Sequence, residues 1–253
     1  MRTQQEINKE WSDNSENYSA IIDDELNSFR AEAWRRKILE QVPSGKKLKI
    51  LDTGCGPGFF TILLSLAGHE VIGIDGAEGM LLEAERKAAA YGVHPEFRAM
   101  DCHHLEFPDN TFDLIISRNV THALREHKTV YAQWLRVLKP EGILLIFDAN
   151  WHLMKTDPAV HEESLRRQEA CVQRYGDAFD TKTKNKEERR KKDLEGEHVL
   201  GTKQRPDWDL GLLEGLGYVN ICTERDITEE LWDEKEQLLY GNTPMFMIRA
   251  EKP

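Results

Sequence analysis

The stretch 49–58, KILDTGCGPG, constrains the fold of this chain more than any other feature. Its aliphatic and β-branched residues predict a buried strand. Its glycines at positions 54, 56 and 58 predict a tight turn whose backbone can approach a ligand closely. The apolar run 59–67 that follows predicts a helix ending at Gly68. The turn therefore lies at a helix N-terminus, where free backbone N–H groups attract electronegative atoms.

The spacing of the glycines argues against a dinucleotide site. A nicotinamide dinucleotide fingerprint needs its third glycine at position 59, where this chain has Phe59. Asp52 followed by Gly54, Gly56 and Gly58 instead resembles the first motif of the class I S-adenosylmethionine (SAM) dependent methyltransferases, an acidic residue before G-x-G-x-G. The alternative is a glycine turn that only joins a strand to a helix.

Acidic residues end the next two predicted strands. Strand 70–75 ends at Asp75, and strand 96–102 carries Asp101 near its end. Ligands of open α/β sheets collect at the carboxyl ends of strands, where a carboxylate can accept both hydroxyls of a ribose. The resemblance implies this ribose role for Asp75, and adenine contacts for Asp101 and the backbone of Cys102. The alternatives are an acidic N-cap at Asp75 and an ordinary turn aspartate at Asp101.

A second segment resembles the same family. The stretch 105–117, LEFPDNTFDLIIS, is a turn leading into a fourth strand, and its FD pair matches a family position. The resemblance is strong over 50–149, whereas the two ends of the chain agree with the family only in the order of their elements. The implied fold is α/β: a Rossmann-like, seven-stranded class I methyltransferase sheet with helices on both faces, closed by antiparallel strands at 218–223 and 245–250.

The rest of the chain is arranged around this core. Residues 1–45 predict a helical N-terminal cap, in which helix 31–42 lies against the sheet because its apolar residues recur at helical spacing. Residues 46–151 form the SAM-binding core. Residues 152–205 form a charged insertion or lid, and residues 206–253 supply a C-terminal helix and the closing strands.

The resemblance implies SAM as the cofactor and S-adenosylhomocysteine as its product. The predicted donor site comprises Tyr18, Asp52, Gly54, Cys55, Gly56, Gly58, Asp75, Gly76, Met80, Asp101, Cys102 and Arg118. A structural role remains an alternative for some of these residues. Met80 suits core packing nearly as well as an adenine contact, and Tyr18 suits packing of the cap on the core.

The acceptor side is predicted from residues near the carboxyl edge of strands four and five. The candidates there are Asn119, His122, Asn150 and Trp151. Trp11 of the N-terminal cap is a further candidate, and no metal ligand is expected. An imidazole at position 122 could remove an acceptor proton at neutral pH, which makes His122 a candidate catalytic base. The preferred interpretation is a histidine that hydrogen-bonds the loop. Methyl transfer from a sulfonium needs mainly binding and orientation, so a dedicated base is optional.

Composition excludes several classes of protein. The chain has 253 residues, of which 31% are charged and 40% hydrophobic, as in a soluble globular domain. No apolar run approaches the roughly 20 residues of a membrane span, and residues 1–6 lack a secretion signal, so a cytoplasmic location is expected. The four cysteines are scattered without a C-x-x-C pair, and His103 and His104 are adjacent, so we expect reduced thiols and no metal site.

The charge pattern bears on the partner. A formal charge of −11 argues against general affinity for nucleic acid, which requires a basic face. The segment 182–192 is an exception, with seven basic residues against two acidic ones. We expect a small-molecule acceptor and a monomer or homodimer. The alternatives are a methyltransferase acting on RNA or protein through Lys182–Lys192, and a catalytically silent SAM-binding regulatory protein; an NAD oxidoreductase ranks behind both.

Overall fold

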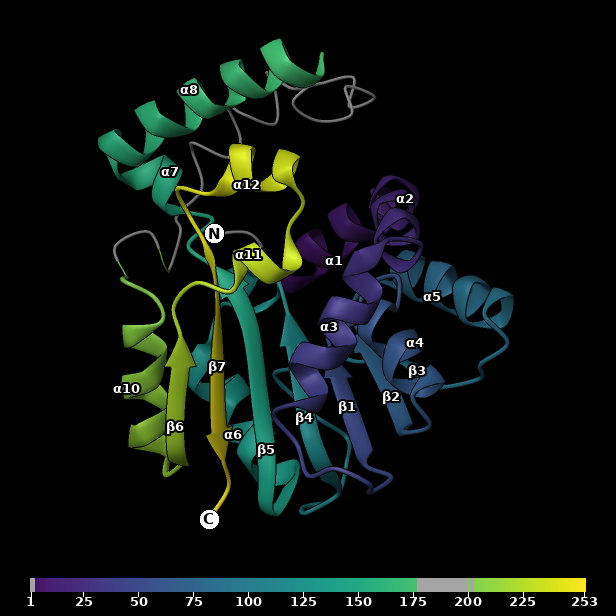
Figure 1. Cartoon of the computed structure of the whole chain (residues 1–253). Helices are drawn as coiled ribbons and strands as arrows, with labels where there is room; N and C mark the ends of the chain where they lie inside the picture. The colour runs from purple at the N-terminus through teal and green to yellow at the C-terminus, as the bar shows by residue number, and fades with distance from the viewer. Residues whose placement is uncertain (1–2, 177–199, 201–202) are drawn as a thin grey trace.

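The computed structural model describes residues 3–176, 200 and 203–253. Within these residues, seven strands form one sheet in the order β3-β2-β1-β4-β5-β7-β6 (Figure 1). The strands are β1 (Lys49–Thr53), β2 (Glu70–Asp75), β3 (Glu96–Ala99), β4 (Phe112–Arg118), β5 (Leu138–Ala149), β6 (Val219–Glu224) and β7 (Met245–Glu251). Strands β1 to β5 pair in parallel, and β7 runs antiparallel between β5 and β6. The predicted class I sheet with its antiparallel closing pair is confirmed.

Helices cover both faces of the sheet. The described α-helices of the chain are α1 (Gln4–Asp13), α2 (Ser15–Leu26), α3 (Phe29–Leu39), α4 (Phe59–Leu66), α5 (Glu78–Ala90), α6 (His127–Val137), α7 (Leu153–Thr156), α8 (Pro158–Tyr175), α10 (Asp207–Leu216), α11 (Thr228–Leu231) and α12 (Glu234–Tyr240). Helices α3, α4 and α5 lie on one face, and α6 and α10 lie on the other (Figure 1). None of the helices in the described part of the chain combines the length and the apolarity that a membrane span requires.

The alternation of side chains along the strands divides the core into two layers. In β4, Leu114 and Ile116 pack against α3 and α4, whereas Ile115 between them packs on the side of α6. In β1, Ile50 and Leu51 divide in the same way. Successive residues of a strand point to opposite faces, so a continuous apolar run fills both layers of a buried parallel sheet.

The third strand is shorter than the sequence predicts, because β3 ends at Ala99 rather than at Cys102. The backbone N–H of Met100 still donates to the carbonyl of Asp75 at 3.0 Å, but the chain then turns, and His104 N–H donates to the carbonyl of Asp101 at 2.9 Å. Residues 100–104 therefore form a turn at the carboxyl end of β2. The turn interpretation of Asp101 holds, and the aspartate still lies at the sheet edge where ligands collect.

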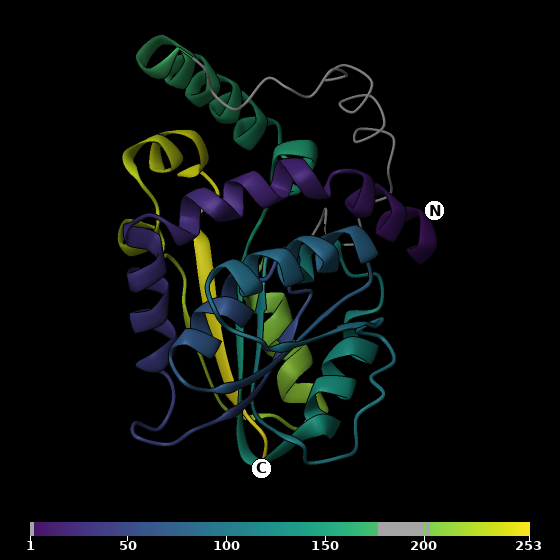
Figure 2. The same cartoon turned by 90° about the vertical axis from the view of Figure 1, so that its right-hand side faces the viewer.

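The N-terminal residues form three helices. Helices α1 and α2 cross above the carboxyl ends of the parallel strands, and α3 descends along one face of the sheet (Figure 2). The expected placement of the third helix against the sheet is confirmed, since Trp34 and Ile38 are buried in the core beneath it. The cap thus lies over the sheet edge that carries the glycine turn.

The segment after β5 begins with α7 and α8, of which α8 lies farthest from the sheet (Figure 1). Helix α8 packs on the C-terminal part of the chain: Arg167 Nη1 donates to the carbonyl of Leu238 at 3.1 Å, and Asn242 Nδ2 donates to Ser164 Oγ at 2.7 Å. The basic segment 182–192 lies outside the described residues.

Replacing Trp34 by alanine should lower the free energy of unfolding by about 3–5 kcal/mol. The indole is only 2% exposed, and its ring centroid lies 5.1 Å from Phe60 and 5.0 Å from Phe147, so its removal leaves a cavity between α3 and the sheet. Phe29 on the same helix is 53% exposed, and Phe29→Ala should change stability by no more than about 0.5 kcal/mol. Urea denaturation followed by circular dichroism measures both values, and equal losses would contradict this packing.

Candidate functional site

The glycine turn after β1 adopts backbone angles that other residues rarely adopt. Gly54, Gly56 and Gly58 have φ values of 67°, 52° and 88°. A Cβ on Gly54 would lie 2.4 Å from Val120 Cγ2, and one on Gly58 would lie 3.1 Å from Ala84 Cβ. The absence of a side chain at Gly54 therefore lets the loop after β4 approach the turn, and its absence at Gly58 lets α5 approach. Gly58 thus serves helix packing and is not among the residues that line the pocket, while its predicted place in the donor site stays a prediction.

The end of β2 holds this turn in place. Cys55 N–H donates to the carbonyl of Ile74 at 2.9 Å, and Gly56 N–H donates to Asp75 Oδ2 at 2.9 Å. The other carboxylate oxygen, Oδ1, accepts from Ala77 N–H at 2.8 Å. Burial raises the pKa of Asp75, and these backbone donors partly offset that rise. Asp75 is not the N-cap of α5, a position that Ala77 occupies, so the N-cap interpretation is wrong.

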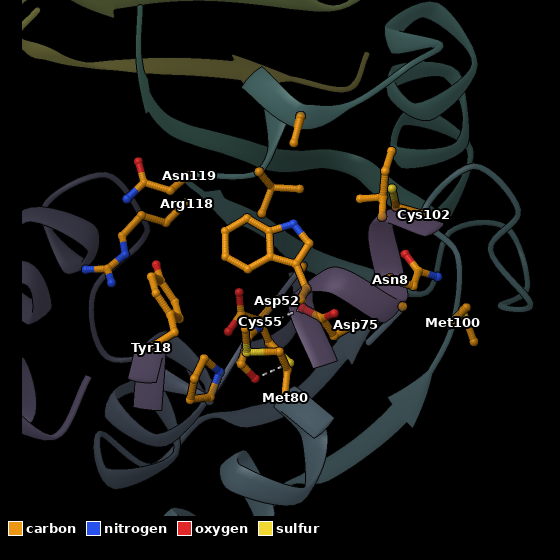
Figure 3. Close-up of a pocket in the computed structure, with 18 of the residues that line it drawn as sticks. Asn8, Tyr18, Asp52, Cys55, Asp75, Met80, Met100, Cys102, Arg118 and Asn119 are labelled. Carbon is orange, nitrogen blue, oxygen red and sulfur yellow. Dashed lines mark hydrogen bonds between the residues drawn. The ribbon is translucent and has the colours of Figure 1, made fainter. Parts of the chain in front are cut away.

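A pocket opens where the turn, the ends of β1 and β2, and the cap meet (Figure 3). It encloses about 1040 Å³ of space not filled by atoms, part of it open to solvent. Thirteen of the predicted site residues line it: Trp11, Tyr18, Asp52, Gly54, Cys55, Gly56, Asp75, Gly76, Met80, Asp101, Cys102, Arg118 and Asn119. The structure thus brings together residues that lie more than a hundred positions apart in the chain.

Other lining residues were not found from the sequence. Ile7 and Asn8 come from α1, and Phe59, Met100 and Leu124 come from the core. Ile7 is four residues before Trp11, a helical spacing that places both side chains on one face and that could have indicated the contact. Asn8 had no sequence signal, because its place depends on how α1 docks on Gly76, where a Cβ would lie 2.7 Å from the Asn8 amide.

Asp52 is a buried carboxylate at the end of β1. It is 3% exposed, and its Oδ2 accepts a hydrogen bond from Thr61 Oγ1 at 2.7 Å. Burial raises the pKa of Asp52 to about 6, against the lowering effect of the Thr61 hydrogen bond. This carboxyl group therefore changes its charge close to neutral pH, at the wall of the pocket.

Arg118 contributes a cation that is already paired. Its Nη2 donates to Glu25 Oε2 of the cap at 2.7 Å, and its guanidinium lies 4.4 Å from the centroid of the Phe59 ring. The side chain is 9% exposed, so it joins α2 to the first turn of α4 at the wall of the pocket. If Arg118 contacts the amino acid part of a cofactor as predicted, its guanidinium binds both that group and Glu25.

Polar contacts attach the cap to α5. Ser19 Oγ donates to Glu83 Oε2 at 2.5 Å, and Gly79 N–H donates to Ser12 Oγ at 3.3 Å. Lys87, which is 1% exposed, forms an ion pair with Asp23. Hydrogen bonds and an ion pair, in addition to apolar packing, therefore hold the cap on α5 beside the pocket.

Three predicted acceptor residues lie outside this pocket. His122 Nδ1 lies 3.0 Å from Asp148 Oδ1, which matches the preferred interpretation of a histidine bonded within the loop. Asn150 exchanges two hydrogen bonds with the backbone of Arg205, at 2.9 and 3.3 Å. Trp151 Nε1 donates to Asp148 Oδ1 at 3.1 Å and to Asn119 Oδ1 at 3.3 Å. Their polar groups bind neighbouring protein atoms.

Burial keeps the two pocket cysteines protonated, which makes them poor nucleophiles. All four cysteines of the chain are free, and burial raises the pKa of Cys102 to about 12 and that of Cys55 well above its ordinary value. Among the described residues, Asp101, Cys102 and His103 place potential ligand atoms within 4.8 Å of one another. His103 Nδ1 already lies 2.6 Å from Asp101 Oδ1, and Cys102 remains a thiol. The two thiols therefore act as apolar lining.

Comparison with known proteins bears on this geometry. Residues 51–146 match the model of a family described as a methyltransferase domain. The chain is 32% identical over 126 residues to a demethylmenaquinone methyltransferase of Thermus thermophilus, covering 49% of this chain and 57% of the relative. It is 35% identical over 101 residues to phosphoethanolamine N-methyltransferase 3 of Arabidopsis thaliana, covering 40% of this chain and 21% of the relative. The chain thus spans little more than half of one relative and a fifth of the other.

Solved structures share the fold. A SAM-dependent methyltransferase from Mesorhizobium loti superposes with a TM-score of 0.58 at 17% identity, covering 90% of this chain and all of that one, 100%. Phosphoethanolamine N-methyltransferase 2 of Haemonchus contortus, in complex with phosphomonomethylethanolamine and S-adenosylhomocysteine, gives a TM-score of 0.57 at 18% identity, covering 87% of this chain and 52% of that one. At these identities the likeness establishes the architecture.

Replacing Asp52 by asparagine should raise the free energy of unfolding at pH 7.5 by about 2–3 kcal/mol. Because the pKa of Asp52 rises from 3.8 to about 6 on folding, the folded chain keeps between about pH 4 and 6 a proton that the unfolded chain releases. This contribution is fully present below about pH 4 and is lost as the pH rises through about 6. At pH 7.5 the buried carboxylate is ionised, at a cost that asparagine avoids.

Urea denaturation at pH 4.5 and 7.5 measures this effect. The native chain should lose stability relative to Asp52→Asn across that interval, and Asp13→Asn, at a side chain that is 63% exposed, should follow the native chain. The same pH dependence in all three proteins would contradict the buried protonated state of Asp52.

Proposed function

We propose that this chain, which contains a class I SAM-dependent methyltransferase domain at residues 51–146, transfers the sulfonium methyl group of SAM to a small-molecule nucleophile. The observation that carries the proposal is the pocket itself. It joins a glycine turn, held open by Asp75, to a second carboxylate at Asp52 and a cap that covers both.

The residues present fit SAM. Gly54 and Gly56 leave the backbone of the turn bare of side chains, and Asp75 retains acceptor capacity beyond its two backbone bonds, because a carboxylate offers about four lone-pair sites. In this proposal Asp75 accepts the ribose hydroxyls. Met80, Met100 and the Cys102 thiol offer an apolar surface to the adenine.

The acidic wall suits the charged end of the same cofactor. Asp52 lines the pocket beside the turn, and its charge acts on Arg118 in addition to that of Glu25. A positively charged ligand favours the ionised form of a carboxyl group near it. We therefore expect Asp52 to be charged when the cofactor is bound and to favour a sulfonium over a neutral thioether.

The chemistry follows from binding and orientation. Bound SAM supplies an already activated methyl group, so transfer requires an in-line approach by the acceptor. The protein holds the two reactants in line and excludes water, and proximity of this kind supplies about 7–11 kcal/mol. The cap helices α1 and α2 provide the exclusion, because Trp11 and Tyr18 line the pocket with their rings 5.8 Å apart in an edge-to-face arrangement.

His122 remains the proposed base where the acceptor carries a proton to be removed. The carboxylate of Asp148 accepts the Nδ1–H of the imidazole, which leaves the lone pair on Nε2. The side chain is 17% exposed and lies on the loop that supplies Asn119 to the pocket wall. Because His122 lies outside the pocket lining, this role requires an acceptor that extends past Asn119 to reach Nε2.

The small-molecule class of acceptor is supported by the relatives, which methylate demethylmenaquinone and phosphoethanolamine according to their names. The alternatives, a macromolecular acceptor bound through Lys182–Lys192 and a silent SAM-binding regulatory protein, remain as predicted from the sequence. A cytoplasmic location, a monomer or homodimer, and the division into cap, core, insertion and closing elements are likewise proposals. Acceptor-side contacts of Trp11 and Asn119 belong to the same proposal.

Replacing Asp75 by asparagine should weaken SAM binding about 10–100-fold, because hydrogen bonds to a charged group contribute roughly 1.5–3 kcal/mol each. Asparagine keeps the size of the side chain and one oxygen acceptor for the turn. Glu70, at the other end of β2 and paired with Lys49 at the surface, gives the control Glu70→Gln. Isothermal titration calorimetry with SAM measures both, and an unchanged Kd in Asp75→Asn would contradict the ribose assignment.

Replacing His122 by glutamine should lower kcat about 100-fold while changing the Kd of SAM less than about threefold. The assay follows labelled methyl transfer from SAM to a panel that includes phosphoethanolamine and a demethylated naphthoquinol. His104→Gln, at an exposed histidine, is the control and should keep native kcat. Native kcat in His122→Gln would assign the histidine to the loop alone. Tight SAM binding without transfer to any acceptor in the panel or in a cell extract would favour the silent binder.

A further inference from the structure

A buried carboxylate at the end of β5, Asp148, accepts hydrogen bonds from the loop that follows β4. Asp148 is 0% exposed and lies outside the pocket lining. Its oxygens accept from Thr121 Oγ1 at 2.5 Å and from His122 N–H at 2.7 Å, in addition to the His122 imidazole. Trp151 Nε1 and Arg205 Nη1 also donate to Asp148, at 3.1 and 3.2 Å.

The same loop forms one wall of the pocket. Thr121 and His122 bond to Asp148, whereas Val120, Ala123 and Leu124 line the pocket. Val120 also fills the space beside Gly54, where a Cβ would lie 2.4 Å from its methyl carbon. The loop therefore presents one side to the buried carboxylate and the other to the pocket, so its position determines the shape of that wall.

The loop begins in a conformation that must be held. Asn119 has a φ of 56°, in the left-handed region that residues other than glycine seldom adopt. Its N–H donates to the carbonyl of Phe147 at 2.9 Å, and its Oδ1 accepts from Trp151 Nε1 at 3.3 Å. Strained backbone of this kind persists where the surrounding contacts determine it, and such contacts cluster at functional sites.

Arg205 joins the distant end of the insertion to this loop. Its side chain is 1% exposed; Nη2 donates to Thr121 Oγ1 at 2.6 Å, and Nε donates to Asp209 Oδ2 at 2.7 Å. The Asn150 side chain bonds to the backbone of Arg205 on both N–H and C=O. Asn150 and Arg205, which flank the segment 152–204, are therefore bonded to each other beside the buried Asp148, next to the loop.

We propose that Arg205 and Asp148 are positioning residues that hold loop 119–124 against the glycine turn and thereby set the affinity of the pocket for its cofactor. A buried ion pair adds little net stability compared with apolar packing, so stability alone does not account for a guanidinium shared among Asp148, Asp209 and Thr121. Neither residue touches the pocket, so both act through the loop. This inference rests on the proposed function, because SAM is the ligand whose affinity reports it.

Titration calorimetry with SAM on the full chain tests the inference, together with the melting temperature of each variant. Arg205→Lys keeps the charge but not the fork of donors, and it should raise the Kd about tenfold. Trp151→Phe removes the Nε1 bonds to Asp148 and Asn119 while keeping a ring, and it should raise the Kd about three- to tenfold. It is a mild change, and it keeps the test decisive should Arg205→Lys fail to fold.

A structural control separates positioning from loss of stability. Lys37 is a buried cation on α3 whose Nζ lies 2.6 Å from Glu224, away from the pocket. Lys37→Met should lower the melting temperature and leave the Kd within twofold of the native value. Native SAM binding with an unchanged Kd in Arg205→Lys or Trp151→Phe, or an equal rise in Lys37→Met, overturns the inference alone. Absence of SAM binding by the native chain overturns the proposed function, and the inference with it.

Discussion

The attachment of the glycine turn to the end of β2 is the interaction on which the rest of the site depends. A turn with three positive φ values has no intrinsic reason to stay open, and glycine loses more conformational freedom on ordering than any other residue. Two hydrogen bonds fix it, from Cys55 to the carbonyl of Ile74 and from Gly56 to the carboxylate of Asp75. Once the turn is fixed, α4 and the loop at Val120 can pack beside it and leave a hollow on the other side.

Asp52, Asp75 and Asp148 all lie at the carboxyl ends of parallel strands. They differ in pKa because different groups surround each carboxylate. Burial would raise the pKa of all three. In Asp148 the His122 and Arg205 side chains reverse that effect and lower the pKa, so it is a fixed charge. Asp75 has mainly backbone donors, and Asp52 has chiefly the Thr61 hydroxyl, which leaves its pKa at about 6. The two carboxylates that face the pocket therefore have the least positive charge from the protein to offset their burial. A cationic ligand can supply that charge.

The sequence predicts the core of the fold and many of the residues that line the pocket, because those depend on local pattern. Glycine spacing locates the turn, and Asp75 is found because it is the last residue of an apolar strand. Residues such as Asn8 escape prediction, since their place depends on how the cap docks on α5. Arg205 lies in a stretch without clear periodicity, and only the fold brings it to Asp148. Asn150 and Trp151, the candidate acceptor residues, follow β5 at this sheet edge, but their polar groups bind Arg205, Asp148 and Asn119.

A crystal structure of the chain with S-adenosylhomocysteine tests the central claim most directly. We expect density for the nucleoside in the pocket, with both ribose hydroxyls within hydrogen-bond distance of the Asp75 carboxylate and the adenine against Met80 and Cys102. A nucleoside bound elsewhere on the chain, or a pocket without nucleoside density at saturating ligand, would contradict this assignment.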